Sequence, residues 1–150
     1  MMPAEQIPVR HLADLLAGLV HAGAAGTRPV NALELDSRRV QPGAVFVALA
    51  GDRSHGLDFL DQALARGAAA VLHAADDPHW DAAAAGACRR AGVAAVAVPG
   101  LPHELGRIAA RFHGEPSTRF ETIAAITGTD GKTSVSHYLA AMLDEPDAPA

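Results

Sequence analysis

The sequence has little of several residue types that mark specialised classes of protein. It contains a single cysteine, Cys88, in 150 residues, so no disulfide can form within the chain, and we expect a reducing, cytoplasmic location. Charged residues make up only 19%, and the formal charge of −5 provides no basic face of the kind that binds nucleic acid. We therefore expect no nucleic-acid partner.

Long apolar runs are also missing. The apolar stretches at residues 68–72 and 93–98 are far shorter than the run of about 20 residues that a membrane helix needs, and no secretory leader pattern opens the sequence. We therefore expect no membrane insertion. The hydrophobic fraction is 49%, which is typical of a globular protein with a sizeable core.

Helical and strand patterns alternate along the chain. Leucines at helical spacing predict an amphipathic helix over residues 9–20, closed by Gly23 and Gly26, and another over residues 57–66 that stops at Gly67. The other expected elements are helices over residues 80–91, 101–112 and 135–143, and strands over residues 45–49, 69–72, 93–98 and 122–126. This alternation predicts an α/β fold.

The strongest chemical signal lies between the last expected strand and the last expected helix. Seven residues there form a candidate phosphate loop: Gly128, Thr129, Asp130, Gly131, Lys132, Thr133 and Ser134. Backbone N–H groups of such a loop, with the positive end of the following helix, can hold nucleotide phosphates. Lys132 would reach the β and γ phosphates, and the Thr133 hydroxyl would bind Mg²⁺. The loop is shorter than the common pattern, and a plain turn before a helix is the alternative.

A second group of polar residues flanks the expected strand 45–49. Leu35-Asp36-Ser37-Arg38 precedes this strand and a predicted tight turn at Pro42-Gly43, and a loop over residues 51–56 follows the strand. The loop carries Arg53, Ser54 and His55 at the start of a helix, which suits a phosphate or diphosphate group. The alternative is that these are ordinary solvated residues, with a surface ion pair between Asp36 and Arg38.

Together the two motifs resemble the Mur ligases of peptidoglycan synthesis. The resemblance runs from about Leu33 to Leu143 and includes the D-S-R and P-G patterns and the T-G-T-D-G-K-T loop. The run Arg111-Phe112-His113-Gly114-Glu115-Pro116-Ser117 and Thr129 are similar to the MurE type, which adds the third peptide residue. Ser134-Val135 leans toward the MurF type, which stays an alternative.

This resemblance implies an ATP- and Mg²⁺-dependent ligase that adds diaminopimelate or lysine to UDP-N-acetylmuramoyl-L-alanyl-D-glutamate through an acyl phosphate, as a monomer. It implies that Lys132 is catalytic, that the seven loop residues bind ATP, and that Thr133 binds Mg²⁺. It also assigns five residues to the UDP-substrate: Leu35, Ser37, Asp52, Arg53 and Ser54.

The resemblance further implies a domain organisation. We expect a UDP-substrate domain over residues 1–99, a connecting helix over residues 100–118, and the first strand, phosphate loop and helix of a P-loop ATPase domain over residues 119–150. The chain would then be an incomplete, inactive fragment of the ligase. The rival from another class is a complete, non-catalytic module that binds a nucleotide or a UDP-sugar.

Two other kinds of site are not expected. Eight histidines are present, but none is paired at i, i+4, so no zinc site is predicted. Cys88 lies in an alanine-rich segment and is interpreted as a small buried apolar residue.

Overall fold

A computed structural model describes residues 10–120 and 122–143 of the chain. The chain divides into two compact units, Met1–Pro116 and Ser117–Ala150, and each is described here by itself. The first unit contains the sheet and most of the helices. The second contains the candidate phosphate loop and one long helix.

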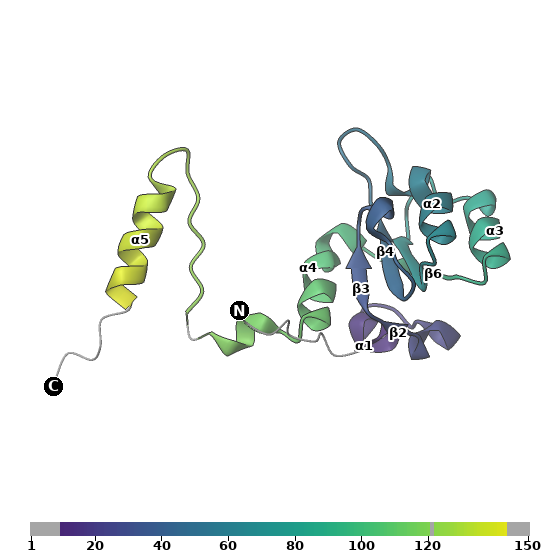
Figure 1. Ribbon diagram of the computed structural model, residues 1–150, viewed down its shortest axis with the longest axis horizontal. Helices are drawn as coiled ribbons and strands as arrows, with labels where there is room; N and C mark the ends of the chain where they lie inside the picture. Colours follow the sequence, from purple (N-terminus) through teal and green to yellow (C-terminus); the bar gives the residue numbers. More distant parts are fainter. Residues whose placement is uncertain (1–9, 121, 144–150) are drawn as a thin grey trace. The chain divides into compact units, whose positions relative to one another are not determined.

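The centre of the first unit is a parallel sheet of four strands (Figure 1). The strands are β3 (Ala32–Glu34), β4 (Ala44–Ala48), β5 (Ala70–Ala74) and β6 (Ala94–Val98), and they lie side by side in that order. All five residues of β4 are buried, because both faces of the sheet are covered. This explains why β4 reads as a continuous apolar run rather than as an alternation.

Helices cover the two faces of this sheet. On one face α2 (Leu60–Ala65) and α3 (Ala82–Arg90) pack against a core that contains Phe46 and Val71. On the other face α1 (Leu12–Leu16) and α4 (Leu101–Phe112) pack against Val47 and Leu72. The first unit therefore has three layers, with the sheet in the middle.

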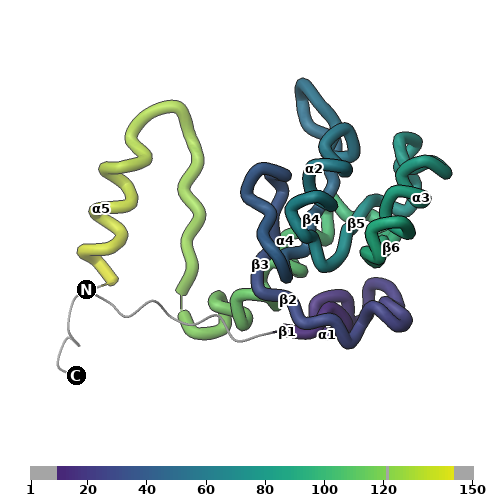
Figure 2. Tube along the Cα trace, turned by 45° about the vertical axis from the view of Figure 1, so that its right-hand side comes forward, coloured from purple at the N-terminus to yellow at the C-terminus, as the bar shows by residue number. Residues whose placement is uncertain are grey.

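Short elements complete the first unit. A small antiparallel pair, β1 (Arg10–His11) with β2 (Pro29–Val30), lies beside α1 (Figure 2). Its 3-10 turns are η1 (Gly23–Thr27), η2 (Ser37–Arg39) and η3 (Gly56–Phe59), while another, η4 (Pro116–Arg119), spans the boundary to the second unit. The tight turn predicted at Pro42-Gly43 is confirmed, with Gly43 at a φ of 91° and the Ala44 N–H donating to the Gln41 carbonyl over 3.0 Å.

Two predicted helices differ from the structure. The helix expected over residues 9–20 ends at Leu16, because Gly18 takes a φ of 72° and turns the chain. Its predicted core residues are nevertheless correct, since Leu12, Leu15 and Leu16 are buried. The helix expected over residues 57–66 begins with the 3-10 turn η3, and its α-helical part has six residues.

The predicted helix over residues 101–112 is confirmed as α4. It begins after Gly100, which takes a φ of 61°, and has a proline in its first turn, where no intrahelical donor is needed. Leu101, Ile108 and Phe112 are buried in the core of the first unit. The segment for which a connecting role is predicted thus also supplies part of this core.

The second unit departs from prediction at the strand expected over residues 122–126. The described residues 122–127 adopt no regular structure, and all except Ile126 are exposed. A strand needs a hydrogen-bonded neighbour, and no described residue from 117 to 143 lies in a strand. The helix after the loop does form, as α5 (Lys132–Leu143), but Val135, Tyr138 and Met142 on it are exposed.

Candidate functional site

The first candidate site is a pocket of about 470 Å³ at the carboxyl end of β3. It is lined by Leu35, Asp36, Ser37, Arg38, Ser54, Phe59 and Gln62. Three of the five residues assigned to the UDP-substrate, Leu35, Ser37 and Ser54, therefore lie around one hollow. Ligands of open parallel sheets bind outside the carboxyl ends of the strands, which is where this pocket lies.

The turn η2 forms one wall of the pocket, and the carboxylate of Asp36 caps this turn. Asp36 accepts a hydrogen bond from the Arg38 N–H over 2.9 Å, and its carboxylate also contacts the Arg38 guanidinium at 2.7 Å. These hydrogen bonds with Arg38 lower the pKa of Asp36 to about 2. The predicted surface ion pair is present, and the same pair shapes the pocket, a role that the sequence did not reveal.

The inner side of the pocket contains a buried hydroxyl. Ser37 is only 5% exposed, and its hydroxyl donates to Oε1 of Gln62 on α2 over 2.5 Å. This bond joins the turn after β3 to the helix after β4. Gln62 and Phe59 were not singled out in the sequence, because neither belongs to the apolar face of Leu57, Leu60 and Leu64 from which that helix was predicted.

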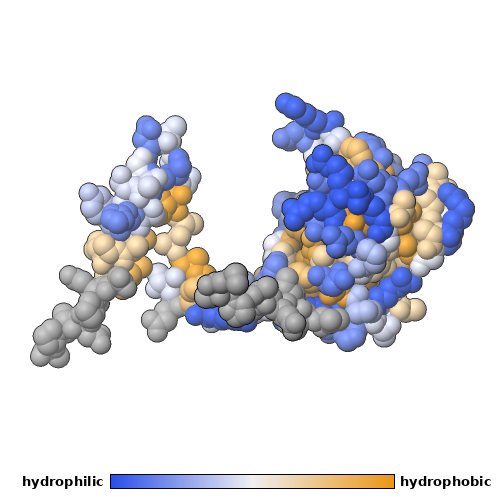
Figure 3. Space-filling model, viewed as in Figure 1, coloured by the Kyte–Doolittle hydropathy of each residue, from blue (hydrophilic) through white to orange (hydrophobic). Residues whose placement is uncertain are grey.

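The loop over residues 51–56 is closed by backbone hydrogen bonds. The Gly51 N–H donates to the Ser54 carbonyl over 3.0 Å, and the Gly56 N–H donates to the Leu49 carbonyl over 2.7 Å. Asp52, Arg53 and Ser54 are exposed. Figure 3 shows strongly hydrophilic side chains over this part of the unit.

One part of the diphosphate prediction needs correction. The helix N-terminus was expected to offer free donors to the anion, but Nδ1 of His55 already accepts the Leu57 N–H over 3.1 Å. The Asp58 carboxylate likewise accepts the His55 N–H over 3.0 Å. These caps leave Arg53 and the exposed part of the loop as the groups available to an anion.

His55 also takes part in a second cluster. Its Nε2 lies 3.2 Å from one oxygen of Asp77, and Nδ1 of His79 lies 3.5 Å from the other. The two imidazole rings stack with their centres 4.3 Å apart. These three groups converge closely enough to be considered as metal ligands. The histidines are 24 residues apart in sequence, so the search for a pair at i, i+4 could not find them.

The hydrogen bonds of His55 indicate a structural role for this cluster. Because Nδ1 accepts the Leu57 N–H, the ring proton is on Nε2, which lies 3.2 Å from an oxygen of Asp77. A metal at Nε2 would move that proton to Nδ1 and break the helix cap. We therefore interpret the cluster as a polar tie, made by His55 and Asp77, between the 51–56 loop and the turn after β5.

The candidate phosphate loop occupies residues 128–134 of the second unit. Gly128 and Gly131 take positive φ values of 143° and 75°, which glycine tolerates best. The Lys132 ammonium folds back over the loop, where it donates to the carbonyls of Gly128 and Thr129. Lys132 is the only lysine in the sequence. Asp130, Thr133 and Ser134 are exposed around the start of α5.

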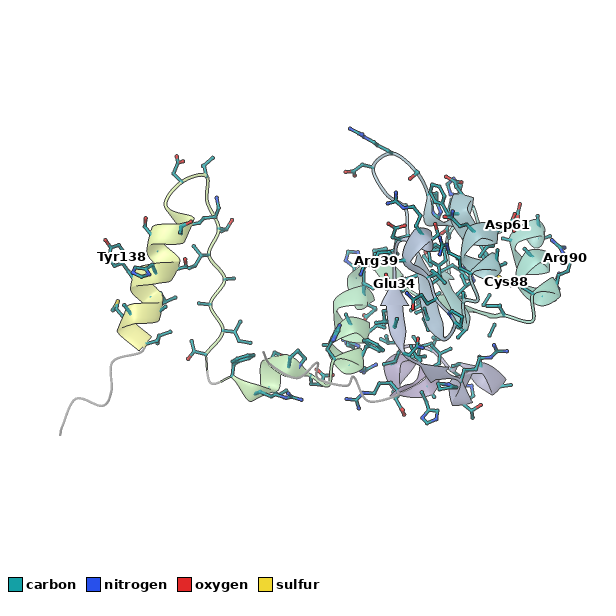
Figure 4. All side chains as sticks on the ribbon, viewed as in Figure 1. Glu34, Arg39, Asp61, Cys88, Arg90 and Tyr138 are labelled. Atoms are coloured by element: carbon teal, nitrogen blue, oxygen red, sulfur yellow. The ribbon has the colours of Figure 1, made fainter. Side chains whose placement is uncertain are left out.

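The environment of Cys88 does not favour a reactive thiol. It is 2% exposed in the core between the sheet and α3, as predicted from the sequence. Burial raises the pKa of its thiol, and the charge of Asp61 on α2 adds to this effect (Figure 4). Both effects favour the unreactive protonated form.

Comparison with known sequences identifies the protein family to which this chain belongs. Residues 29–113, more than half of the chain, match the family described as "Mur ligase family, catalytic domain". The chain therefore belongs to the Mur ligase family. The matched range includes the whole sheet and the pocket at β3.

Curated relatives carry the name UDP-N-acetylmuramoyl-L-alanyl-D-glutamate–2,6-diaminopimelate ligase. That of Alkalilimnicola ehrlichii is 53% identical over 121 residues, which is 80% of this chain and 24% of the relative. That of Chromobacterium violaceum is 47% identical over 113 residues, or 75% of this chain and 21% of the relative. The predicted resemblance to the MurE type is thus confirmed. The chain spans only about a quarter of the length of these relatives.

Solved structures show the same fold. A ligase from Acinetobacter baumannii, named as UDP-N-acetylmuramoylalanyl-D-glutamyl-2,6-diaminopimelate–D-alanyl-D-alanyl ligase, matches 93% of this chain and 29% of its own length with a TM-score of 0.62 at 22% identity. A crystal structure of MurF from the same organism matches 71% of this chain and 21% of its own length with a TM-score of 0.51 at 19% identity. Within the described residues, no helix is both long and apolar enough to span a bilayer.

Proposed function

We propose that this chain provides the substrate-binding domain and the start of the ATP-binding domain of a MurE-type ligase. This enzyme would join diaminopimelate to UDP-N-acetylmuramoyl-L-alanyl-D-glutamate in the cytoplasm, acting as a monomer. The observation that carries the proposal is the pocket at β3, which brings together Leu35, Ser37 and Ser54. The names of the curated relatives support diaminopimelate rather than lysine as the added amino acid.

The substrate's UDP end would lie in the pocket at β3 and along the neighbouring loop. Leu35 and Ser37 would contact the uridine, and Asp52, Arg53 and Ser54 would lie along the diphosphate. Arg53 is the cation among these five and is exposed, so it can approach an anion. The carboxylate tie through Asp77 and His55 would hold the loop in place.

The loop over residues 128–134 would bind ATP. In this reaction class, a substrate carboxylate oxygen bonds to the γ-phosphorus as ADP leaves, and the incoming amine then displaces phosphate from the acyl phosphate. The Lys132 ammonium already lies over the loop carbonyls and can turn to offset charge on the phosphates. The exposed Thr133 hydroxyl is an oxygen donor of the type that Mg²⁺ prefers, and the ion would neutralise phosphate charge there.

We retain the proposed domain boundaries of 1–99, 100–118 and 119–150. The exposed apolar side chains of α5 support the assignment of the last segment to a larger ATP-binding domain, since such a helix face is normally covered. They argue against the rival in which the chain is a non-catalytic module that binds a nucleotide or a UDP-sugar.

The substrate assignment can be tested by mapping amide chemical shifts of the chain during titration with UDP. We expect changes at Ser37 and residues 52–56, and Arg53→Ala should weaken binding about tenfold, as expected for loss of one charge-assisted hydrogen bond. Arg90→Ala, on the outward side of α3, is the matched control (Figure 4). Changes confined to residues 128–134 would mean that UDP only imitates ATP, and the assignment would be wrong.

The nucleotide assignment can be tested through the single lysine. Reductive methylation with ¹³C places one side-chain label at Lys132, besides the amino terminus. MgATP should shift this signal, while UDP should leave it unchanged. An unshifted Lys132 signal at saturating MgATP would exclude the proposed contact with the phosphates.

A further inference from the structure

The pocket at β3 contains an unusual pair of exposed apolar side chains. Leu35 is 52% exposed and Phe59 is 45% exposed. Among the described residues of the first unit, these two are the large hydrophobic side chains that are classed as exposed, and both line this pocket. An aromatic face and an aliphatic side chain on one hollow are suited to a flat ring, because such rings stack on aromatic side chains.

The same pocket holds a side-chain amide, that of Gln62, whose oxygen is hydrogen-bonded to a buried hydroxyl. Oε1 of Gln62 accepts the Ser37 hydroxyl over 2.5 Å, and Ser37 is buried. The Gln62 amide nitrogen, with its two N–H donors, therefore points away from Ser37. Gln62 lines the pocket, so this end of its side chain offers donors and no acceptor to a bound ring.

This donor distinguishes between the two pyrimidine bases. Uracil has a carbonyl oxygen, an acceptor, at the position where cytosine has an amino group, a donor. The Gln62 amide N–H can donate to the carbonyl oxygen of uracil, whereas it finds no acceptor in the amino group of cytosine. A site that is built to pair one hydrogen-bonding group rejects the analogue that lacks it.

We infer that Phe59 and Gln62 select the nucleobase of the substrate, Phe59 by stacking on the ring and Gln62 by donating to the carbonyl at C4 of uracil. This inference rests on the proposed function and adds two specificity-determining residues to it. Ser37 acts as a positioning residue, because its hydroxyl fixes which end of the Gln62 amide faces the base.

The test is a change of base preference rather than a loss of binding. Binding of uridine, cytidine, UDP and CDP to the chain is measured by chemical-shift titration. Wild type should prefer the uracil ligands by about tenfold. Gln62→Glu keeps an oxygen for Ser37 but offers the base an acceptor, so the preference should reverse toward cytosine. The neutral nucleosides separate this effect from repulsion between the new carboxylate and a diphosphate.

Two further variants complete the design. Phe59→Ala should weaken uridine and cytidine equally, by about tenfold, and Phe59→Tyr should restore both. Asp61→Asn changes the charge of the same helix outside the pocket and should leave the base preference unchanged. If wild type binds no UDP, the proposed function fails. If UDP binds at the pocket but Gln62→Glu leaves the uridine-to-cytidine ratio unchanged, the present inference fails while the proposed function stands.

Discussion

Gly56 is a position where a single methyl group should disturb the substrate loop. An ideal Cβ at Gly56 would lie 2.7 Å from the Leu49 nitrogen and 2.8 Å from the Ala48 Cα. Both atoms belong to the backbone at the end of β4, and the Gly56 N–H also donates to the Leu49 carbonyl over 2.7 Å. Ordinary contacts of a Cβ begin at about 3.4 Å, so Gly56→Ala forces the loop and the strand apart.

We expect Gly56→Ala to lower the free energy of unfolding by about 1–3 kcal/mol, the usual cost of adding a methyl group where backbone cannot move freely. With a urea dependence of about 1–2 kcal/mol per molar, the unfolding midpoint should fall by about 1 M. The measurement is urea unfolding followed by circular dichroism, together with UDP titration, because the same shift displaces Arg53 and Ser54.

Gly106 provides the matched control. It lies inside α4, and a Cβ there would meet no atom within 4 Å. Gly106→Ala should therefore stabilise the protein by about 0.5–1 kcal/mol, since alanine loses less backbone entropy in a helix. Equal effects of the two substitutions, or unchanged stability with Gly56→Ala, would refute the close approach of the loop to β4.

Three other predictions concern polar and titratable side chains of the first unit. Arg111→Ala removes the Nη1 donor shared by the carbonyls of Leu15 and Ala17, at 3.0 and 2.7 Å, and should lower the free energy of unfolding in urea by about 1.5–3 kcal/mol. In the control Arg107→Ala, which loses a surface ion pair with Glu104, it should fall by less than about 1 kcal/mol. Equal losses in the two variants would contradict this role of Arg111. Asp77→Asn should destabilise the 51–56 loop, which would be measured as faster amide hydrogen exchange at residues 52–57. Asp76→Asn, at an exposed neighbouring position, is the control and should leave the exchange unchanged. Unchanged exchange in Asp77→Asn would exclude the tie between Asp77 and His55. Burial lowers the pKa of His73 below 6.5, so the folded state favours the neutral ring and loses stability as the pH falls below about 6.5. Between about pH 7 and pH 5 the urea concentration at the unfolding midpoint should therefore fall less in His73→Phe, which can still stack on Trp80, than in the wild type. An equal fall in both proteins would mean that other groups cause it.

The sequence predicted the elements whose determinants are local. Helix α4 was predicted with its correct ends, because Pro99-Gly100 ends the strand before it and the Glu115-Pro116 segment follows it. The helix over residues 9–20 was extended too far because Leu19 continues the helical spacing of the leucines before it, whereas Gly18 turns the chain before Leu19 is reached. The strand at residues 122–126 was predicted from composition alone, whereas its formation depends on a partner strand.

The site was predicted in part for similar reasons. Leu35, Ser37 and Ser54 come from motifs, so they were found, and the structure places them around one pocket. Gln62 and His79 act through partners 25 and 24 residues away in sequence, Ser37 and His55 respectively. Spacing along the chain carries no information on such pairs until the order of the strands is known.

The order of the strands has a consequence for synthesis on the ribosome. Because β3, β4, β5 and β6 pair in chain order, each strand that leaves the exit tunnel finds the edge of the preceding one already available. The face that α1 covers is completed only by Leu101, Ile108 and Phe112 of α4. We therefore expect the nascent domain to keep an apolar face open to chaperones until α4 has emerged, and to close before the phosphate loop has emerged from the tunnel.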